Sequence, residues 1–146
     1  MRMTTNKGFT LLELLVVITI LAFISTLAGV NLHGGDRSDL ESVARTLVTD
    51  LRYVRSRAMV GNVDTEITID PSSGSYYSRN AEIDRPLPES ISVELTVDLR
   101  DTDGERGRIV FYPDGSSSGG EVLLSRNGRR LGVTTAWLNG YVSIQE

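Results

Sequence analysis

The sequence of 146 residues contains no cysteine, one histidine and one lysine. Without cysteine the chain can form no disulfide and offers no thiolate to a metal or substrate, so it must be stabilised by packing alone. His33 has no partner at a spacing that indicates a catalytic triad or a zinc site. The serines of 116–118 also lack the context of a nucleophile elbow. We therefore expect no enzyme, no catalytic residue, no cofactor and no metal.

Charged side chains are absent from a long stretch near the N-terminus, from Leu14 to Gly35. About 20 helical residues cross the hydrocarbon core of a bilayer, so this window suffices for one transmembrane helix. Arg2 and Lys7 precede the window, whereas Asp36 and Arg37 beyond it nearly cancel. Because basic flanks stay in the cytoplasm, we expect a single-pass protein with a cytoplasmic N-terminus and its remaining residues on the other side.

The part of the chain beyond the window is acidic. Residues 34–146 hold 13 arginines and 18 acidic residues, a formal charge of −5 against −4 for the whole chain. An acidic domain attracts phosphates poorly, so we expect no nucleic-acid partner. The alternative is phosphate binding by one of two arginine clusters, within 52–57 and 126–130, of which the second is expected to be the solvated tip of a hairpin.

A second helix is predicted over about 38–61. Ser38 or Asp39 can cap its start, after a break at the Gly34-Gly35 pair, and Gly61-Asn62 can end it. A three-four spacing of apolar residues puts one stripe on a core, and the opposite face is polar. The stripe is formed by Leu40, Val43, Ala44, Leu47, Leu51, Val54 and Ala58, and the polar face by Glu41, Arg45, Thr49, Asp50, Arg52 and Arg57.

Six or seven strands are predicted after this helix. Ile67 and Ile69 alternate with polar residues, and the period-two pattern is cleanest from Ile91 to Leu99. Residues 122–124 are expected to pair with 131–133 across the Asn127-Gly128 turn, and Asn139-Gly140 marks another turn. The chain therefore reads as an α+β protein in which a long N-terminal helix packs on antiparallel sheets, with one globular domain over 36–146.

The segment from Lys7 to Glu13 reads Lys-Gly-Phe-Thr-Leu-Leu-Glu and opens directly into the apolar window. Secretory signals are cut after their apolar part, whereas here the only obvious processing point precedes it. This arrangement resembles the class III signal of type IV pilins and pseudopilins. The resemblance implies a leader over 1–8, cleavage by prepilin peptidase between Gly8 and Phe9, and methylation of the new Phe9 terminus. It also implies a transmembrane helix over 9–33, in which Glu13 meets the terminal amine of a neighbouring subunit during filament assembly.

The predicted second helix and the end of the globular domain are similar to the GspH/FimT family. The similarity rests on the runs 47–58, 109–124 and 137–144, whereas residues 71–108 match nothing distinctive. It implies a minor pseudopilin of the type II secretion pseudopilus, anchored in the bacterial inner membrane with a periplasmic domain. The implied partners are the pseudopilins GspG, GspI, GspJ and GspK, with secreted cargo as a further implied contact. The alternative is a FimT-like minor pilin of type IV pili or DNA uptake, which residues 140–143 disfavour because they read Gly-Tyr-Val-Ser in place of a basic ending.

Three features of the sequence allow a second interpretation. Glu13 could be solvated at headgroup depth instead of paired, as in a tethered adaptor that never assembles. The acidic run from Asp101 to Glu105 has the opening rhythm of a calcium loop but lacks its later ligands, so a solvated turn is expected. Trp137 and Tyr141 are expected to pack in the core and its rim, with a subunit contact as the alternative.

Overall fold

The computed structural model describes residues 11–30 and 34–146. The chain divides into two compact units, residues 1–35 and residues 36–146. In the first unit the described element is the helix α1, Leu11–Val30. The second unit holds nearly all of the helix α2, Gly34–Gly61, and every strand described below.

The helix α2 begins at Gly34, four residues before the predicted start at Ser38. The glycine pair does not break the helix because it lies in the first turn, where the backbone N–H groups have no intrahelical acceptor in any case. The predicted C-terminal end is confirmed. Asn62 adopts the left-handed conformation with φ 50°, and the Val63 N–H donates to the Ala58 carbonyl at 3.3 Å.

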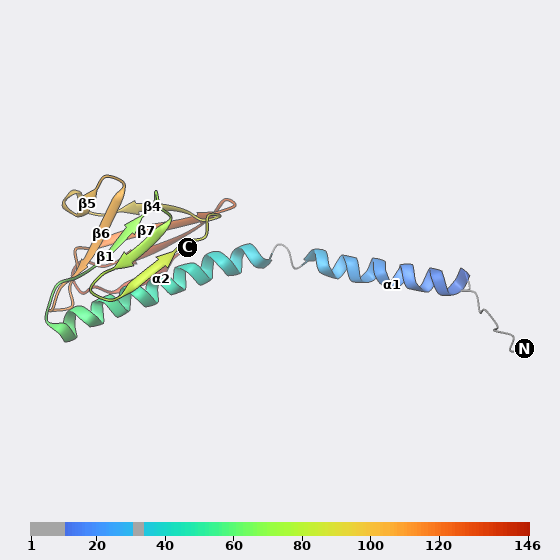
Figure 1. Cartoon of the computed structure of the whole chain (residues 1–146), viewed down its shortest axis with the longest axis horizontal. Helices are drawn as coiled ribbons and strands as arrows, with labels where there is room; N and C mark the ends of the chain where they lie inside the picture. The colour runs from blue at the N-terminus through green and yellow to red at the C-terminus, as the bar shows by residue number, and fades with distance from the viewer. Residues whose placement is uncertain (1–10, 31–33) are drawn as a thin grey trace, which may run out of the picture. The chain divides into compact units, whose positions relative to one another are not determined.

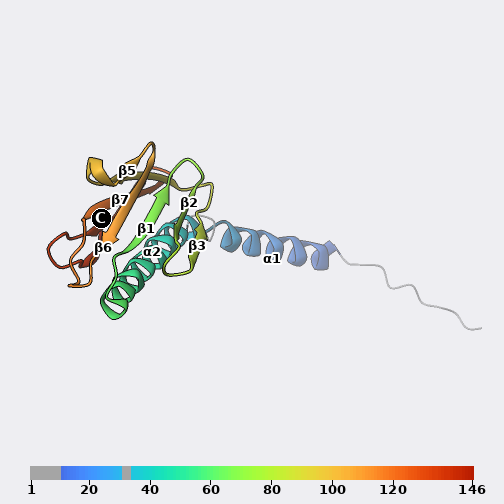
Figure 2. The ribbon, with the colours of Figure 1, turned by 60° about the vertical axis from the view of Figure 1, so that its left-hand side comes forward.

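The apolar stripe of α2 is the organising feature of the second unit. Leu47, Leu51 and Val54 are at most 1% exposed, and Val43 at the margin is half-buried. In Figures 1 and 2 the helix lies along one side of the strands, and its stripe joins the same core cluster as both sheets. The prediction of a long helix packed on antiparallel sheets is therefore confirmed.

Nine strands form two antiparallel sheets within residues 34–146. One sheet has the order β3-β2-β1-β6-β5, and the other has the order β4-β7-β8-β9. The bounds of the first sheet are β1 Thr65–Asp70, β2 Ser75–Ser78, β3 Ile83–Pro86, β5 Thr102–Asp103 and β6 Arg106–Phe111. Those of the second are β4 Ser92–Thr96, β7 Gly120–Arg126, β8 Arg129–Thr135 and β9 Val142–Gln145.

The β7–β8 hairpin forms in the predicted register. Val122 lies opposite Val133 and Leu124 opposite Leu131. The turn residues Asn127 and Gly128 have φ values of 50° and 79°. Two successive positive φ angles are those of a type I′ turn, whose twist matches the flanking strands, and asparagine followed by glycine is the pair that adopts them most readily.

Residues 71–108 differ most from the sequence-based expectation. The strand predicted over 91–99 is shorter, since β4 ends at Thr96 and a 3-10 turn, η1, occupies Leu99–Asp101. The short strands β3 and β5 bring the total to nine rather than six or seven. Both lie at an edge of their sheet, where strands of two to four residues carry too little hydrophobic alternation to be recognised in a sequence.

Candidate assembly site

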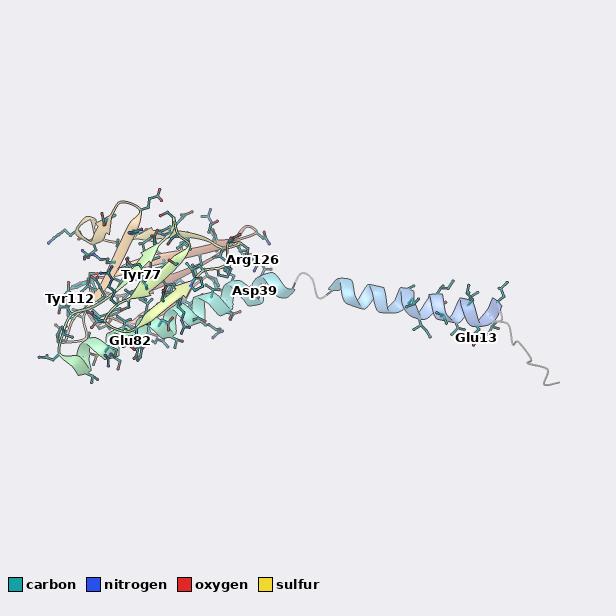
Figure 3. The ribbon with its side chains drawn as sticks, in the orientation of Figure 1. Glu13, Asp39, Tyr77, Glu82, Tyr112 and Arg126 are labelled. Atoms are coloured by element: carbon teal, nitrogen blue, oxygen red, sulfur yellow. The ribbon has the colours of Figure 1, made fainter. Side chains whose placement is uncertain are left out.

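The helix α1 carries one acidic residue, Glu13, in its first turn. Figure 3 shows this side chain near the beginning of the helix. A carboxylate here is favoured by about 0.3–1 kcal/mol, because the first N–H groups of a helix carry a partial positive charge. The predicted cleavage and methylation residues, Gly8 and Phe9, lie outside the described residues, as does His33.

The rest of α1 is apolar on every side rather than along one stripe. From Leu11 to Leu21 its large aliphatic side chains are between 46% and 83% exposed within this single chain. Contiguous exposed apolar surface of this kind marks contact with lipid or with another protein. Within residues 11–30 and 34–146, no helix combines the length and the hydropathy that a bilayer span requires.

The first sheet is joined to α2 by a polar network around one buried carboxylate, that of Asp50. The Tyr76 hydroxyl donates to Asp50 Oδ2 at 2.9 Å, and Arg85 Nε donates to the same oxygen at 3.3 Å. Burial raises the pKa of Tyr76, and the neighbouring Asp50 carboxylate raises it further. Asp50 was expected on the polar face of the helix but is only 8% exposed. Helical periodicity places it beside the stripe, and only the fold brings Tyr76 and Arg85 to it.

Two arginines of α2 donate hydrogen bonds to backbone carbonyls in the C-terminal part of the chain. Arg52 Nη2 donates to the Val142 carbonyl at 2.9 Å, and Arg55 Nε donates to the Gly115 carbonyl at 3.0 Å. Gly140 has φ 59°, and a Cβ added there would lie 2.5 Å from the Gly115 oxygen. Only glycine fits this position, because both the conformation and the space exclude a side chain. The Asn139-Gly140 turn is thereby fixed against the end of the helix.

The residues around this turn are exposed. Trp137 is 68% exposed, Leu138 70% and Tyr141 61%. The expectation that Trp137 and Tyr141 pack in the core and its rim is therefore wrong. Both side chains flank the Asn139-Gly140 turn instead of entering the core. The alternative, a subunit contact, is consistent with this exposure.

The other candidate sites have structural partners. Asp101 lies 3.9 Å from Arg108, and no group of three or more His, Asp or Glu side chains within residues 11–30 and 34–146 is arranged to hold a metal. Arg126 pairs with Asp39 at 2.9 Å, and both are labelled in Figure 3. In the other cluster, Arg52 and Arg55 bind the backbone carbonyls of Val142 and Gly115.

Comparison with known families matches nearly the whole chain. The family described as Type II transport protein GspH matches residues 43–139, and the prokaryotic N-terminal methylation motif matches residues 3–29. Type II secretion system protein H of Xanthomonas campestris pv. campestris is 31% identical over 141 residues. That alignment covers 93% of this chain and 81% of the relative.

Solved structures share the fold. The minor pseudopilin EpsH of the Vibrio cholerae type 2 secretion system has a TM-score of 0.57 at 12% identity, over 73% of this chain and 96% of EpsH. The type IV minor pilin FimU of Pseudomonas aeruginosa has a TM-score of 0.55 at 15% identity, over 75% of this chain and 90% of FimU. These likenesses confirm the pilin-like fold, but they do not distinguish a subunit of a secretion system from a subunit of a type IV pilus. The family match covers more than half of the chain and the 31% identical relative agrees with it, so this chain belongs to the GspH family of type II transport proteins.

Proposed function

We propose that this chain is matured at Gly8-Phe9, anchored by residues 9–33 and built into a pseudopilus through Glu13. As a member of the GspH family with type II secretion system protein H as a relative, this chain is a minor pseudopilin of the type II secretion system. The proposal concerns how it performs that role. The observation that carries it is an apolar helix with a single acid in its first turn, preceded by Gly8-Phe9 and followed by a domain with its own core.

Processing before the apolar part leaves the helix on the mature protein. The match of residues 3–29 to the methylation motif supports this position of the cut. Cleavage after Gly8 removes Arg2 and Lys7 and exposes the Phe9 amine, four residues before Glu13. The mature chain then begins with an apolar helix that bears one cation and one anion about a turn apart.

In this proposal Glu13 favours association of the helix with a neighbouring subunit. On insertion scales an acidic side chain costs roughly 2.5–3.5 kcal/mol at the centre of a membrane helix, which is an upper bound for Glu13 in the first turn, and a partner cation recovers part of that cost. The Phe9 amine of an adjacent subunit would be such a cation. The exposed aliphatic side chains of α1 would supply the remaining contact between helices.

The location and partners follow from this mechanism. Residues 9–33 would cross the inner membrane once, with the N-terminus cytoplasmic and residues 36–146 in the periplasm, as the basic flank and the charge-free window support. The partners would be prepilin peptidase during maturation, GspG along the filament, and GspI, GspJ and GspK near its tip. The acidic domain would face these subunits and the secreted cargo.

Mass spectrometry of the native protein tests maturation. We expect an intact mass that corresponds to residues 9–146 with one added methyl group. A chain that retains Met1, or one that begins beyond residue 30, would contradict the proposal, since either lacks the free Phe9 amine next to an apolar helix.

Replacement of Glu13 tests assembly. In Glu13→Val we expect normal membrane insertion, because an apolar residue enters the bilayer more readily than a carboxylate, but loss of most incorporation into the pseudopilus. Quantitative immunoblotting of sheared filaments and of membranes measures the two. Thr19→Val is the matched control, since Thr19 lies in the same helix and its hydroxyl bonds only its own helix, to the Leu15 carbonyl. Equal incorporation of Glu13→Val and the control would exclude the role of Glu13.

A further inference from the structure

A groove of about 1090 Å³ lies between α2 and the edge of the second sheet. Its floor is apolar and comes from Leu40 and Val48 of the helix and from Leu131 and Ile144 of the sheet. The α2 residues that line it extend from Leu40 to Arg52, or about 18 Å at 1.5 Å per residue. At about 3.4 Å per extended residue, this length accommodates roughly five residues of a strand.

The wall of the groove on the sheet side is an edge strand with unused hydrogen-bonding groups. In the strand order β4-β7-β8-β9, β9 is paired on one side only. The Tyr141 carbonyl accepts from the Ala136 N–H at 2.9 Å, so Tyr141 faces β8. Because alternate residues of an antiparallel strand face opposite sides, Val142 and Ile144 direct their N–H and C=O groups outward.

One of these outward groups is already occupied. Arg52 donates to the Val142 carbonyl at 2.9 Å, so this carbonyl is not available to a further strand. The Ile144 N–H and C=O have no backbone or side-chain partner among the residues that the structure describes. An unpaired edge of this kind is a template for one more strand.

The charges around the groove are those that an acidic segment would satisfy. Its arginines are Arg45, Arg52, Arg129 and Arg130, and its acids are Glu41 and Glu146. Arg45 is paired with Glu41. Arg129 and Arg130 are exposed and form no ion pair within the described residues, although the domain as a whole carries a charge of −5. The groove is therefore a local positive site on an acidic domain.

We infer that this groove binds an extended acidic segment of another protein, which adds as a fifth strand beside β9. Its backbone would pair with Ile144, alternate apolar side chains would enter the floor at Leu131 and Val48, and its carboxylates would meet Arg129 and Arg130. The inference is independent of how the chain is matured or assembled, because every residue it uses lies in residues 36–146.

The test uses the full chain in detergent micelles and a fluorescent, end-blocked peptide of alternating glutamate and valine. Anisotropy titration measures its Kd. We expect the peptide to bind, and a lysine–valine peptide of the same length to bind at least about tenfold more weakly, because it places like charges beside the arginines. An acidic peptide whose amides on the side that faces β9 are N-methylated keeps its charge but cannot pair with Ile144, and we expect it not to bind.

A charge-reversal variant locates the site. In Arg129→Glu/Arg130→Glu we expect the Kd of the acidic peptide to rise about tenfold or more. The control is Arg57→Glu/Arg79→Glu, which makes the same charge change at two exposed arginines outside the groove and should leave the Kd unchanged.

Four outcomes would overturn the inference. The first is that the acidic peptide does not bind, and the second is that its N-methylated form binds with the same Kd. The third is that Arg57→Glu/Arg79→Glu raises the Kd as much as the groove variant does. The fourth is that the chain associates with itself and that only the groove variant abolishes this association. The last outcome, measured by sedimentation, would assign the groove to a second copy of this chain. Binding to anionic vesicles but not to the peptide would assign Arg129 and Arg130 to lipid headgroups instead.

Discussion

The two helices of this protein use apolar residues in opposite ways. In α1 they occupy every side, and from Leu11 to Leu21 they remain exposed within the chain. In α2 they form one stripe that is buried against two sheets, while the other side is polar. The amount of apolar surface therefore matters less than its periodicity. A stripe folds onto its own chain, whereas a helix that is apolar all round needs lipid or other subunits.

The largest effect on the stability of the domain should come from its core. In Phe111→Ala we expect a loss of about 3–5 kcal/mol in the free energy of unfolding, because Phe111 is fully buried and its removal leaves a cavity. Leu15→Ala in α1 should leave that free energy unchanged, because Leu15 is 55% exposed and lies outside the core cluster. Urea unfolding followed by circular dichroism measures both. Similar losses in the two variants would show that α1 contributes to the folding of the domain, which would contradict the contrast drawn between the two helices.

A smaller effect is expected at the polar link between α2 and the first sheet. Tyr76→Phe should lower the free energy of unfolding by about 1.5–3 kcal/mol, because it removes a buried hydrogen bond to the Asp50 carboxylate. Tyr77→Phe is the control on the same strand, since the Tyr77 hydroxyl has no hydrogen-bond partner in the described part of the chain. If the two variants lose equally, the Asp50 link does not stabilise the packing of α2.

The smallest effect is expected on the pH dependence of the free energy of unfolding, through Asp70 at the end of β1. The Ser72 hydroxyl, the Ser73 N–H and Arg106 all bind Asp70, and they hold the pKa of this carboxyl well below its usual value of 3.8, against the opposing effect of its burial. A carboxyl with a lowered pKa in the folded state stabilises the fold above about pH 3.8, and this contribution is lost as the pH falls further.

Asp70→Asn should therefore flatten the decline of stability below about pH 4. The decline should not vanish, because the Ser116 hydroxyl and N–H also lower the pKa of Asp114. Thermal melts between about pH 2 and pH 7 measure the effect, because this range extends on both sides of the usual pKa of 3.8, below which the contribution of Asp70 declines. Glu89→Gln removes an exposed carboxylate that makes no hydrogen bond within the described residues, and it should keep the pH dependence of the unmodified protein.

The parts of the fold that were predicted correctly share a local signal. The α2 stripe, the β7–β8 register and the Asn127-Gly128 turn each depend on residues close together in the sequence. The parts that were missed depend on distant contacts. Asp50 looks like a surface acid until Tyr76 and Arg85 reach it, and β3 is a strand only because β2 lies beside it. The start of α2 was missed because glycine weakens a helix less in its first turn than in its interior.

The candidate assembly site stays a prediction from the sequence. Gly8, Phe9 and Glu13 were chosen from one motif, and of these the structure describes only Glu13, in the first turn of α1. The exposure of Trp137 and Tyr141 was not predicted. Both flank the Asn139-Gly140 turn, and whether an aromatic side chain there is buried is set by the tertiary packing and not by a local pattern.

By itself the sequence determined the family, the α+β class and the division between an apolar helix and an acidic domain, because motifs, periodicity and charge are local properties of a chain. Only the tertiary structure decided which polar residues are buried, which turn exposes its aromatic side chains, and that β9 is left with an open edge beside four arginines. These features are set by contacts between residues up to 90 positions apart, such as Arg52 with Val142, and such contacts leave no periodic trace in the sequence.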